Sequence, residues 1–150
     1  MTRARLQTDG GARGNPGPAG IGIVLSDSDG NVLDERYEGI GIATNNVAEY
    51  NALIAGLELA LEQEITEIEV LLDSALVVAQ VKGEWKIRND RLRTLAVKAR
   101  SLLNRFASSS IAHIPREQNA EADKLANKGM DESEVAVAGD DELGQSSLLQ

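Results

Sequence analysis

Four acidic residues stand where the chain is expected to change from one element of secondary structure to the next. Asp9 ends an expected strand, Glu49 lies one turn into an expected helix, and Asp73 ends a second strand. Asp123 lies in the first turn of the last expected helix. Carboxylates that are brought together repel one another unless a cation lies between them. The chain has no cysteine, so any metal would be held mainly by oxygen, as Mg²⁺ and Mn²⁺ are.

Each of these acids also has an explanation that involves no chemistry. Glu49 suits a capping box with Asn46, and Asp123 suits the positive end of a helix dipole. Asp9 and Asp73 suit turns. For any single acid this structural explanation is the better one. A shared pattern favours a chemical role for the acids taken together. The apolar run "IEVLL" is followed by Asp73 and then at once by an expected helix. In the same way, the first strand ends at Asp9 before a glycine-rich loop.

Hydrophobic periodicity predicts an α/β protein with a mixed five-stranded sheet flanked by helices. Three strands come first and form an antiparallel meander, and the later strands alternate with helices. The expected strands are residues 3–8, 20–26, 32–39, 66–73 and 109–114. The expected helices are residues 44–63, 74–83, 90–106 and 119–129. Adjacent parallel strands would place Asp9 and Asp73 side by side at one edge of the sheet.

Length and composition favour a single domain with a buried core. The chain has 150 residues, of which 42% are hydrophobic and 26% are charged. We expect the domain to cover residues 1–130, and we expect residues 131–150, which hold six acids and no base, to form a disordered tail. No apolar run approaches the length that spans a bilayer, and the N-terminus lacks the apolar core of a signal peptide. We therefore expect a cytoplasmic protein without a membrane partner.

The charge distribution bears on the kind of partner. A formal net charge of −9 argues at first against nucleic acid, because phosphates attract Lys and Arg. Residues 82–100, however, hold seven bases and two acids, and such a patch can bind a polyanion. A solvated basic face on the helix that begins at Asp90 explains the same residues equally well.

The segment between Asp9 and the second strand reads "GGARGNPGPAG". Glycines and prolines this dense indicate a turn whose backbone comes close to another group. A tight turn alone would need fewer of them.

Four segments resemble, in order, the motif blocks of the type 1 ribonuclease H family: "TDGGARGNPGPAG", "TNNVAEYNALIAGL", "LLDSALVV" and "PREQNAEADKLAN". Each block alone is a weak signal, whereas all four in this order are a strong one. The resemblance covers about residues 3–130 and is to the prokaryotic form with a "PRExN" motif. It implies the ribonuclease H-like fold and an endonuclease that hydrolyses the RNA strand of RNA/DNA hybrids.

The resemblance implies that Asp9, Glu49, Asp73 and Asp123 are catalytic metal ligands. In-line attack of water on a phosphodiester requires neutralisation of charge on the attacking and leaving oxygens, and two Mg²⁺ or Mn²⁺ ions about 4 Å apart supply it. Asp9, Glu49 and Asp73 would hold one ion, and Asp9 would share the second with Asp123. The products would carry 5′-phosphate and 3′-hydroxyl ends.

The resemblance also implies contacts with the hybrid. The backbone of the loop that starts at Gly10 and Gly11 would test for the 2′-hydroxyl of ribose. Asn15, Asn45 and Asn46 would contact the minor groove. Thr44 would contact a phosphate of the DNA strand. Trp85, beside Lys86, would contact deoxyribose. Asn45 and Asn46 also suit the start of a helix, and a lone tryptophan is more often a core or hinge residue.

The sequence departs from the family pattern in three places. Ala75 stands where many relatives carry a glutamine, and Asn89 follows Asp73 by only 16 positions, which leaves no room for the basic insertion of some members. We therefore expect modest substrate affinity. The family's catalytic histidine would be His113, but this residue lies in an expected strand, and a strand-edge histidine explains it as well. We favour Arg116, whose guanidinium could contact the scissile phosphate in a bidentate manner.

Other functions stay open on the sequence alone. A non-catalytic hybrid-binding module would not need the four acids. A nuclease of the same fold that cuts RNA/RNA or DNA junctions would not need sensors of the 2′-hydroxyl. An acidic protein-interaction domain explains the tail and nothing else. We expect a monomer that acts on RNA/DNA hybrids, with double-stranded RNA as a further candidate substrate.

Overall fold

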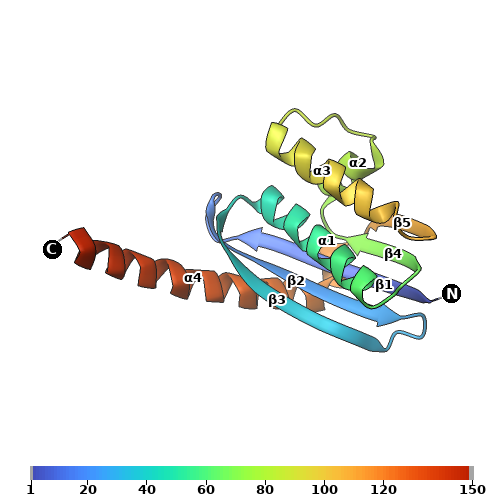
Figure 1. Ribbon diagram of the computed structural model, residues 1–150, viewed down its shortest axis with the longest axis horizontal. Helices are drawn as coiled ribbons and strands as arrows, with labels where there is room; N and C mark the ends of the chain where they lie inside the picture. The colour runs from blue at the N-terminus through green and yellow to red at the C-terminus, as the bar shows by residue number, and fades with distance from the viewer. Residues whose placement is uncertain (1, 149–150) are drawn as a thin grey trace.

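The computed structural model describes residues 2–148, which form a five-stranded sheet with helices on both faces (Figure 1). The strands are β1 (Arg3–Ala12), β2 (Gly17–Asp27), β3 (Val32–Ala43), β4 (Glu67–Leu72) and β5 (Ser108–His113). Their order across the sheet is β3-β2-β1-β4-β5. β2 is antiparallel to both of its neighbours, and β4 is parallel to both of its neighbours. The structure therefore confirms the mixed sheet that the sequence predicts.

The helices are α1 (Asn45–Glu62), α2 (Ala75–Lys82), α3 (Asp90–Leu103) and α4 (Ala120–Leu148), with a short 3-10 turn at Arg116–Gln118 before α4. α1 packs on β1 and β2 and against α3, while α4 packs on β2 and β3 (Figure 1). None of the helices described in residues 2–148 has the combination of length and apolar character that crossing a bilayer requires.

Alternation along β2 shows why the sheet needs helices on both faces. Ile23 and Leu25 belong to the large core that includes Leu53 and Leu57 of α1. The intervening Val24 packs instead with Ala122 and Leu125 of α4. Successive side chains of a strand point to opposite faces, so an apolar residue at every position requires cover on each side.

The two central parallel strands form the rigid part of this core. Leu6 of β1 and Val70 and Leu72 of β4 are fully buried. Each such side chain contributes about 1.5–3 kcal/mol to stability through burial of apolar surface. The strand ends that follow are thereby held in fixed positions.

The first strand is longer than predicted. Asp9 does not end β1, because the strand continues to Ala12 and pairs Gly10 with Ile21 and Gly11 with Gly20 of β2. Gly10 and Gly11 therefore belong to the sheet and not to the loop. The loop itself is confined to residues 13–16 between β1 and β2.

The start of α1 also differs from the prediction. The N-cap is Thr44, whose Oγ1 accepts a hydrogen bond from the backbone nitrogen of Val47 at 3.2 Å, and Asn46 lies inside the helix. Glu49 is thus not the partner in a capping box. Its carboxylate is free for another role.

The last helix does not end at Gly129 as predicted. It runs from Ala120 to Leu148, and its C-terminal half projects past the end of the strands (Figure 1). Gly129 lies inside the helix, where its missing side chain allows close packing on β3: a Cβ at this residue would lie 2.4 Å from the backbone oxygen of Glu38. One turn later Ser133 is buried, and its Oγ donates to the backbone oxygen of Ala19 at 2.5 Å.

Residues 131–148, which were expected to be disordered, are accordingly helical, and residues 149–150 lie outside the described residues. The contacts of Ser133 extend the packed unit beyond residue 130. The division into a domain over 1–130 and a separate acidic tail stays a prediction.

Candidate active site

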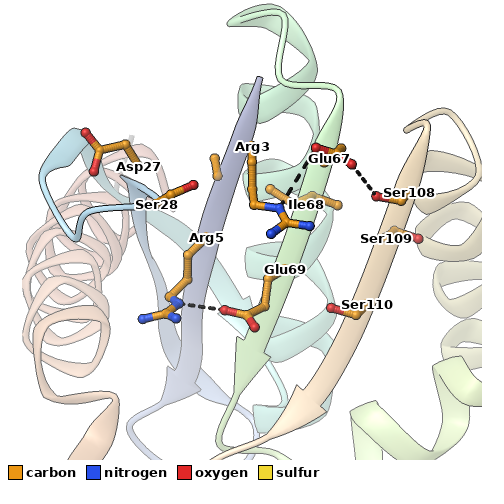
Figure 2. A pocket seen from close by; sticks show the side chains of 11 residues that line it. Arg3, Arg5, Asp27, Ser28, Glu67, Ile68, Glu69, Ser108, Ser109 and Ser110 are labelled. Atoms are coloured by element: carbon orange, nitrogen blue, oxygen red, sulfur yellow. Dashed lines mark hydrogen bonds and ion pairs between the residues drawn. The ribbon is translucent and has the colours of Figure 1, made fainter. Parts of the chain in front are cut away.

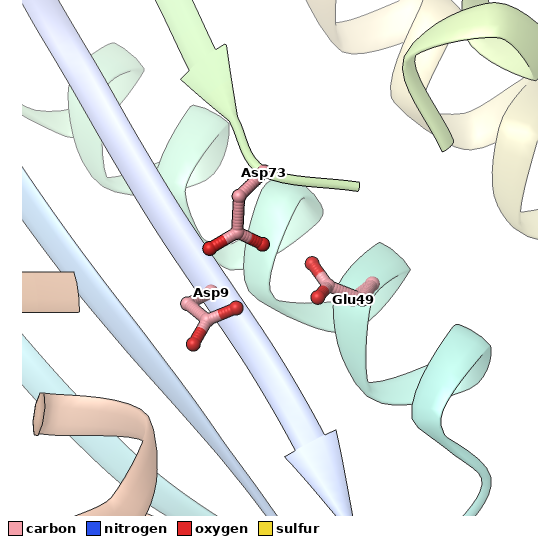
Figure 3. Close-up of side chains that lie close together, drawn as sticks. All are labelled: Asp9, Glu49 and Asp73. Atoms are coloured by element: carbon pink, nitrogen blue, oxygen red, sulfur yellow. The ribbon is translucent and has the colours of Figure 1, made fainter. Parts of the chain in front are cut away.

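Three of the four acids converge. Asp9, Glu49 and Asp73 each offer one carboxylate oxygen, and these three oxygens all lie within 4.8 Å of one another. Their side chains point toward a common space from β1, from α1 and from the segment that follows β4 (Figure 3). Such a spacing is suited to oxygen coordination of a divalent cation.

The pairing of two parallel strands brings Asp9 and Asp73 together. Thr8 of β1 is the register partner of Leu72, the last residue of β4. Asp9 follows Thr8 within β1, and Asp73 follows Leu72 immediately after the end of β4. The two carboxylates therefore meet at the C-terminal end of β4, as the sequence predicts.

Glu49 reaches the pair because α1 lies directly on β1. A Cβ at Gly10 would lie 2.2 Å from the backbone oxygen of Ala48 and 2.7 Å from the backbone nitrogen of Glu49. Only glycine permits this approach, since real Cβ atoms do not come so close. Gly10, which was expected to contact substrate, thus has a structural role: it allows α1 to bring Glu49 to the other acids.

The cluster is electrostatically unfavourable without a cation. Burial, followed by the charge of Asp73, raises the pKa of Asp9 to about 7. Burial, followed by the charges of Asp9 and Asp73, raises the pKa of Glu49 to about 10. In addition, Oε2 of Glu49 is buried and has no hydrogen-bond partner among residues 2–148. A buried oxygen of this kind is costly unless something binds it, and a divalent cation fits both the oxygen and the surplus of negative charge.

Asp123 and Arg116 complete one wall of the same cleft, which has a volume of about 510 Å³. Arg116 Nη2 lies 3.3 Å from Oδ1 of Asp123 and forms the only ion pair that the described side chains make with the four acids. The charge of Asp123 raises the pKa of Arg116, so its guanidinium stays protonated. The Arg116 side chain is 77% exposed and is therefore accessible to an anion.

His113 occupies a different position. It is exposed at the end of β5, where it is the register partner of Leu72. Arg116 lines the cleft of the acids, whereas His113 is not among the lining residues in the described part of the chain. This placement supports the preference for Arg116, and the catalytic role of either residue stays a prediction.

Most of the residues expected to contact substrate line either the cleft of the acids or a second hollow beside it. Gly10, Gly11 and Asn45 line the cleft. The second hollow has a volume of about 490 Å³ and lies where the loop, the start of α1 and the start of α3 meet. Its polar and charged lining residues are Asn15, Thr44, Asn46, Asn89 and Arg91.

Two asparagines join the loop to the start of α1. The backbone nitrogen of Asn45 donates to Oδ1 of Asn15 at 3.0 Å, and Oδ1 of Asn45 accepts from the backbone nitrogen of Ala12 at 2.8 Å. These bonds hold the loop against the helix between the two hollows. Asn45 therefore has a structural role, but it is not the helix cap that was expected, because Thr44 caps α1.

Trp85 and Lys86 lie in the connection between α2 and α3. Trp85 is 52% exposed, so it is not the core residue that a lone tryptophan usually is, and Lys86 is exposed beside it. An exposed tryptophan next to a lysine is suited to contact with a nucleic acid.

Sequence reasoning missed two residues of the site. Arg13, in the loop after β1, lines the cleft and pairs with Asp131 and Glu134 of α4 at 2.5 and 3.1 Å. Asn119 is buried and donates a hydrogen bond from Nδ2 to Oδ2 of Asp73 at 3.3 Å. The last residue of the "PREQN" segment offered a signal for Asn119, but it was assigned only to the start of a helix.

A further hollow at the opposite end of the sheet has both of its arginines already paired with glutamates (Figure 2). Arg5 of β1 lies 2.7 Å from Glu69 of β4, and Arg3 lies 3.9 Å from Glu67. Ser108 of β5 donates to Glu67 at 3.4 Å. These cross-strand pairs stabilise the sheet surface, and the hollow contains no cluster like that of the acids.

Comparison with known proteins agrees with the fold. Residues 7–129 match a family described as "Reverse transcriptase-like". The chain is 47% identical over 136 residues to the "Bifunctional protein Rv2228c" of Mycobacterium tuberculosis, and the match covers 90% of this chain and 37% of that protein. It is 47% identical over 131 residues to the "Ribonuclease HI" of Halobacterium salinarum, and this match covers 87% of this chain and 66% of that protein. This chain thus spans less than two thirds of the length of these relatives.

Solved structures show the same relationship. The N-terminal RNase H domain of Rv2228c superposes with a TM-score of 0.88 at 45% identity, covering 91% of this chain and 99% of that domain. LC11-RNase H1 in complex with an RNA/DNA hybrid gives a TM-score of 0.81 at 44% identity, covering 87% of this chain and 98% of that protein. The fold and the acid cluster define a ribonuclease H-like domain. The chain belongs to the type 1 ribonuclease H family.

Proposed function

We propose that the protein is an endonuclease that hydrolyses the RNA strand of RNA/DNA hybrids. The observation that carries this proposal is the convergence of Asp9, Glu49 and Asp73, with Asp123 in the same cleft. The relatives named ribonuclease H and the hybrid complex of LC11-RNase H1 support it.

The acids fit a pair of divalent cations, Mg²⁺ or Mn²⁺. We assign Asp9, Glu49 and Asp73 to one ion, and Asp9 with Asp123 to the second. When bound, the ions neutralise negative charge on the attacking and leaving oxygens of the phosphodiester. The unpartnered Oε2 of Glu49 and the raised pKa values of Asp9 and Glu49 support this assignment, because each reflects the need for a positive charge.

The reaction adds water to the scissile phosphorus and breaks its bond to the 3′ oxygen, so one product ends in a 3′-hydroxyl and the other in a 5′-phosphate. Arg116, exposed and charged at the rim of the cleft, is suited to bind a non-bridging oxygen of that phosphate. His113 lies outside the lining of the cleft and is the second candidate for assistance.

The two hollows suggest how a hybrid would lie. The RNA strand would occupy the cleft of the acids, where the backbone at Gly10 and Gly11 meets the ribose 2′-hydroxyl. Asn15, Asn45 and Asn46, at the boundary between the hollows, would contact the minor groove. Thr44 would contact a phosphate of the DNA strand in the second hollow, and Trp85 with Lys86 would contact its deoxyribose.

A substrate panel tests this proposal. The protein is offered an RNA/DNA hybrid, an RNA duplex and a DNA duplex with Mg²⁺, Mn²⁺ or chelator, beside the variant Asp73→Asn. Cleavage of the RNA strand of the hybrid, abolished by chelator and by Asp73→Asn, is expected, with 5′-phosphate ends. Additional cleavage of the RNA duplex is compatible with the proposal, because the RNA duplex and the hybrid both expose ribose. Cleavage of DNA alone, or binding of the hybrid without cleavage, would refute the proposal.

We further propose that the protein is cytoplasmic and acts as a monomer. The second part is supported by the origin of all four acids in one chain. Light scattering of the purified protein tests the oligomeric state. A stable dimer whose dissociation abolished cleavage would contradict it.

A further inference from the structure

Asn119 is a buried polar residue that the proposed catalytic set does not include. It is 1% exposed and immediately precedes α4. A residue in this position commonly caps the helix by accepting hydrogen bonds through its side chain. The amide of Asn119 is instead directed toward the ends of β1 and β4.

Three hydrogen bonds fix the orientation of this amide. Nδ2 donates to the backbone oxygen of Thr8 at 2.9 Å and to Oδ2 of Asp73 at 3.3 Å. Oδ1 accepts from Nε2 of Gln7 at 3.3 Å. Exchanging Oδ1 and Nδ2 would bring an acceptor against two other acceptors, so the observed orientation is the one that satisfies every group.

The contacts link the two strands that carry acids. Thr8 precedes Asp9 on β1, and it is the register partner of Leu72, which precedes Asp73. Asn119 therefore holds the carboxylate of Asp73 against the strand that bears Asp9. Asp73 is only half-buried, and repulsion from Asp9 would otherwise favour rotation of its side chain toward solvent.

We propose that Asn119 is a positioning residue, which orients the Asp73 carboxylate so that the cation site is formed before a cation binds. It neutralises nothing and touches no substrate. Its role is to occupy Oδ2 of Asp73 with a neutral donor and to leave the remaining oxygen for the cation. This inference rests on the proposed function only in so far as that function requires a cation at the acids.

Titration calorimetry with Mn²⁺ alone, without nucleic acid, tests the inference. Asn119→Ala and Asn119→Ser are each expected to weaken Mn²⁺ binding about 10- to 100-fold, the range observed when a partner of a metal ligand is removed. The serine variant keeps a side-chain oxygen that can cap α4, so it separates positioning of Asp73 from the start of the helix.

Ser133→Ala is the matched control. Ser133 is also a buried polar residue of the last helical segment, and it too bonds to the backbone of the sheet, but at Ala19 on β2. We expect this variant to lower the melting temperature while it leaves Mn²⁺ affinity unchanged.

Wild-type affinity in both Asn119 variants would overturn the inference, as would an equal loss in Ser133→Ala. Failure of both Asn119 variants to fold would also overturn it, because the residue would then serve the fold itself. Hybrid cleavage is measured separately. A wild-type protein that binds Mn²⁺ without cleaving the hybrid would refute the proposed function and leave the role of Asn119 standing.

Discussion

Gly10 of β1 and Glu49 of α1 are in backbone contact: a Cβ at residue 10 would lie 2.7 Å from the nitrogen of Glu49. The missing side chain lets the helix rest on the strand, and this contact carries the Glu49 carboxylate to Asp9. Packing of the core and assembly of the site therefore depend on the same glycine.

Gly10→Ala should affect stability and cation binding together. The added methyl group must displace α1, and overpacking of this kind costs about 1–3 kcal/mol. We expect a lower free energy of unfolding in urea and weaker Mn²⁺ binding. Gly139→Ala is the control, because a Cβ there would meet no described atom within 4 Å outside the adjacent residues and helix backbone, and alanine favours a helix by about 0.5–1 kcal/mol. Unchanged Mn²⁺ affinity in Gly10→Ala would show that Glu49 does not depend on this contact.

The stability of the cation-free protein should fall as the pH rises above about 4. The pKa of Asp9 is raised from 3.8 to about 7, and that of Glu49 from 4.5 to about 10. Between the unfolded and folded values the folded state binds more protons than the unfolded state, so raising the pH favours unfolding. Thermal melts in chelator should show the decline, and Mg²⁺ should raise the melting temperature more at pH 8 than at pH 5. A melting temperature that rose with pH in chelator would contradict this reading.

Asp9→Asn should be more stable than the wild type in chelator at pH 8, because it removes a buried charge from a cluster of like charges. The same change removes a proposed cation ligand and should abolish hybrid cleavage. Melts and cleavage assays on one preparation test both effects. If the variant were less stable than the wild type at pH 8, repulsion among the acids would not be the dominant cost.

The sequence was sufficient to predict the mixed five-stranded sheet and the meeting of Asp9 with Asp73. Both follow from hydrophobic periodicity and from the way parallel strands share an edge. It was not sufficient to place Gly10. A glycine after an acid reads as a turn, whereas the structure pairs Gly10 with Ile21 of β2 and packs α1 against it.

The end of α4 was missed for a similar reason. Gly129 and the acidic residues after it resemble a helix stop followed by a polar tail. The structure places Gly129 against the backbone of Glu38 and buries Ser133 one turn later, and neither contact has a signature in the local sequence. Asn119 was misjudged because a helix-start asparagine usually bonds to its own helix.

Arg116→Ala should lower the turnover number for the hybrid by at least about tenfold, since a charge-assisted bond to phosphate contributes about 1.5–3 kcal/mol. His113→Ala should stay close to the wild type, because His113 lies outside the lining of the cleft. Steady-state kinetics on one labelled hybrid compare the two. Unchanged turnover in Arg116→Ala with a hundredfold loss in His113→Ala would reverse the assignment.

The most direct test of the central claim, that acids from four separate segments form one cation-dependent hydrolytic site, is single-turnover cleavage of a hybrid by four variants: Asp9→Asn, Glu49→Gln, Asp73→Asn and Asp123→Asn. With Mg²⁺ present, each substitution should slow RNA-strand cleavage by about a hundredfold or more while the protein stays folded. Cleavage at the wild-type rate by a folded variant of any of the four acids would contradict the account.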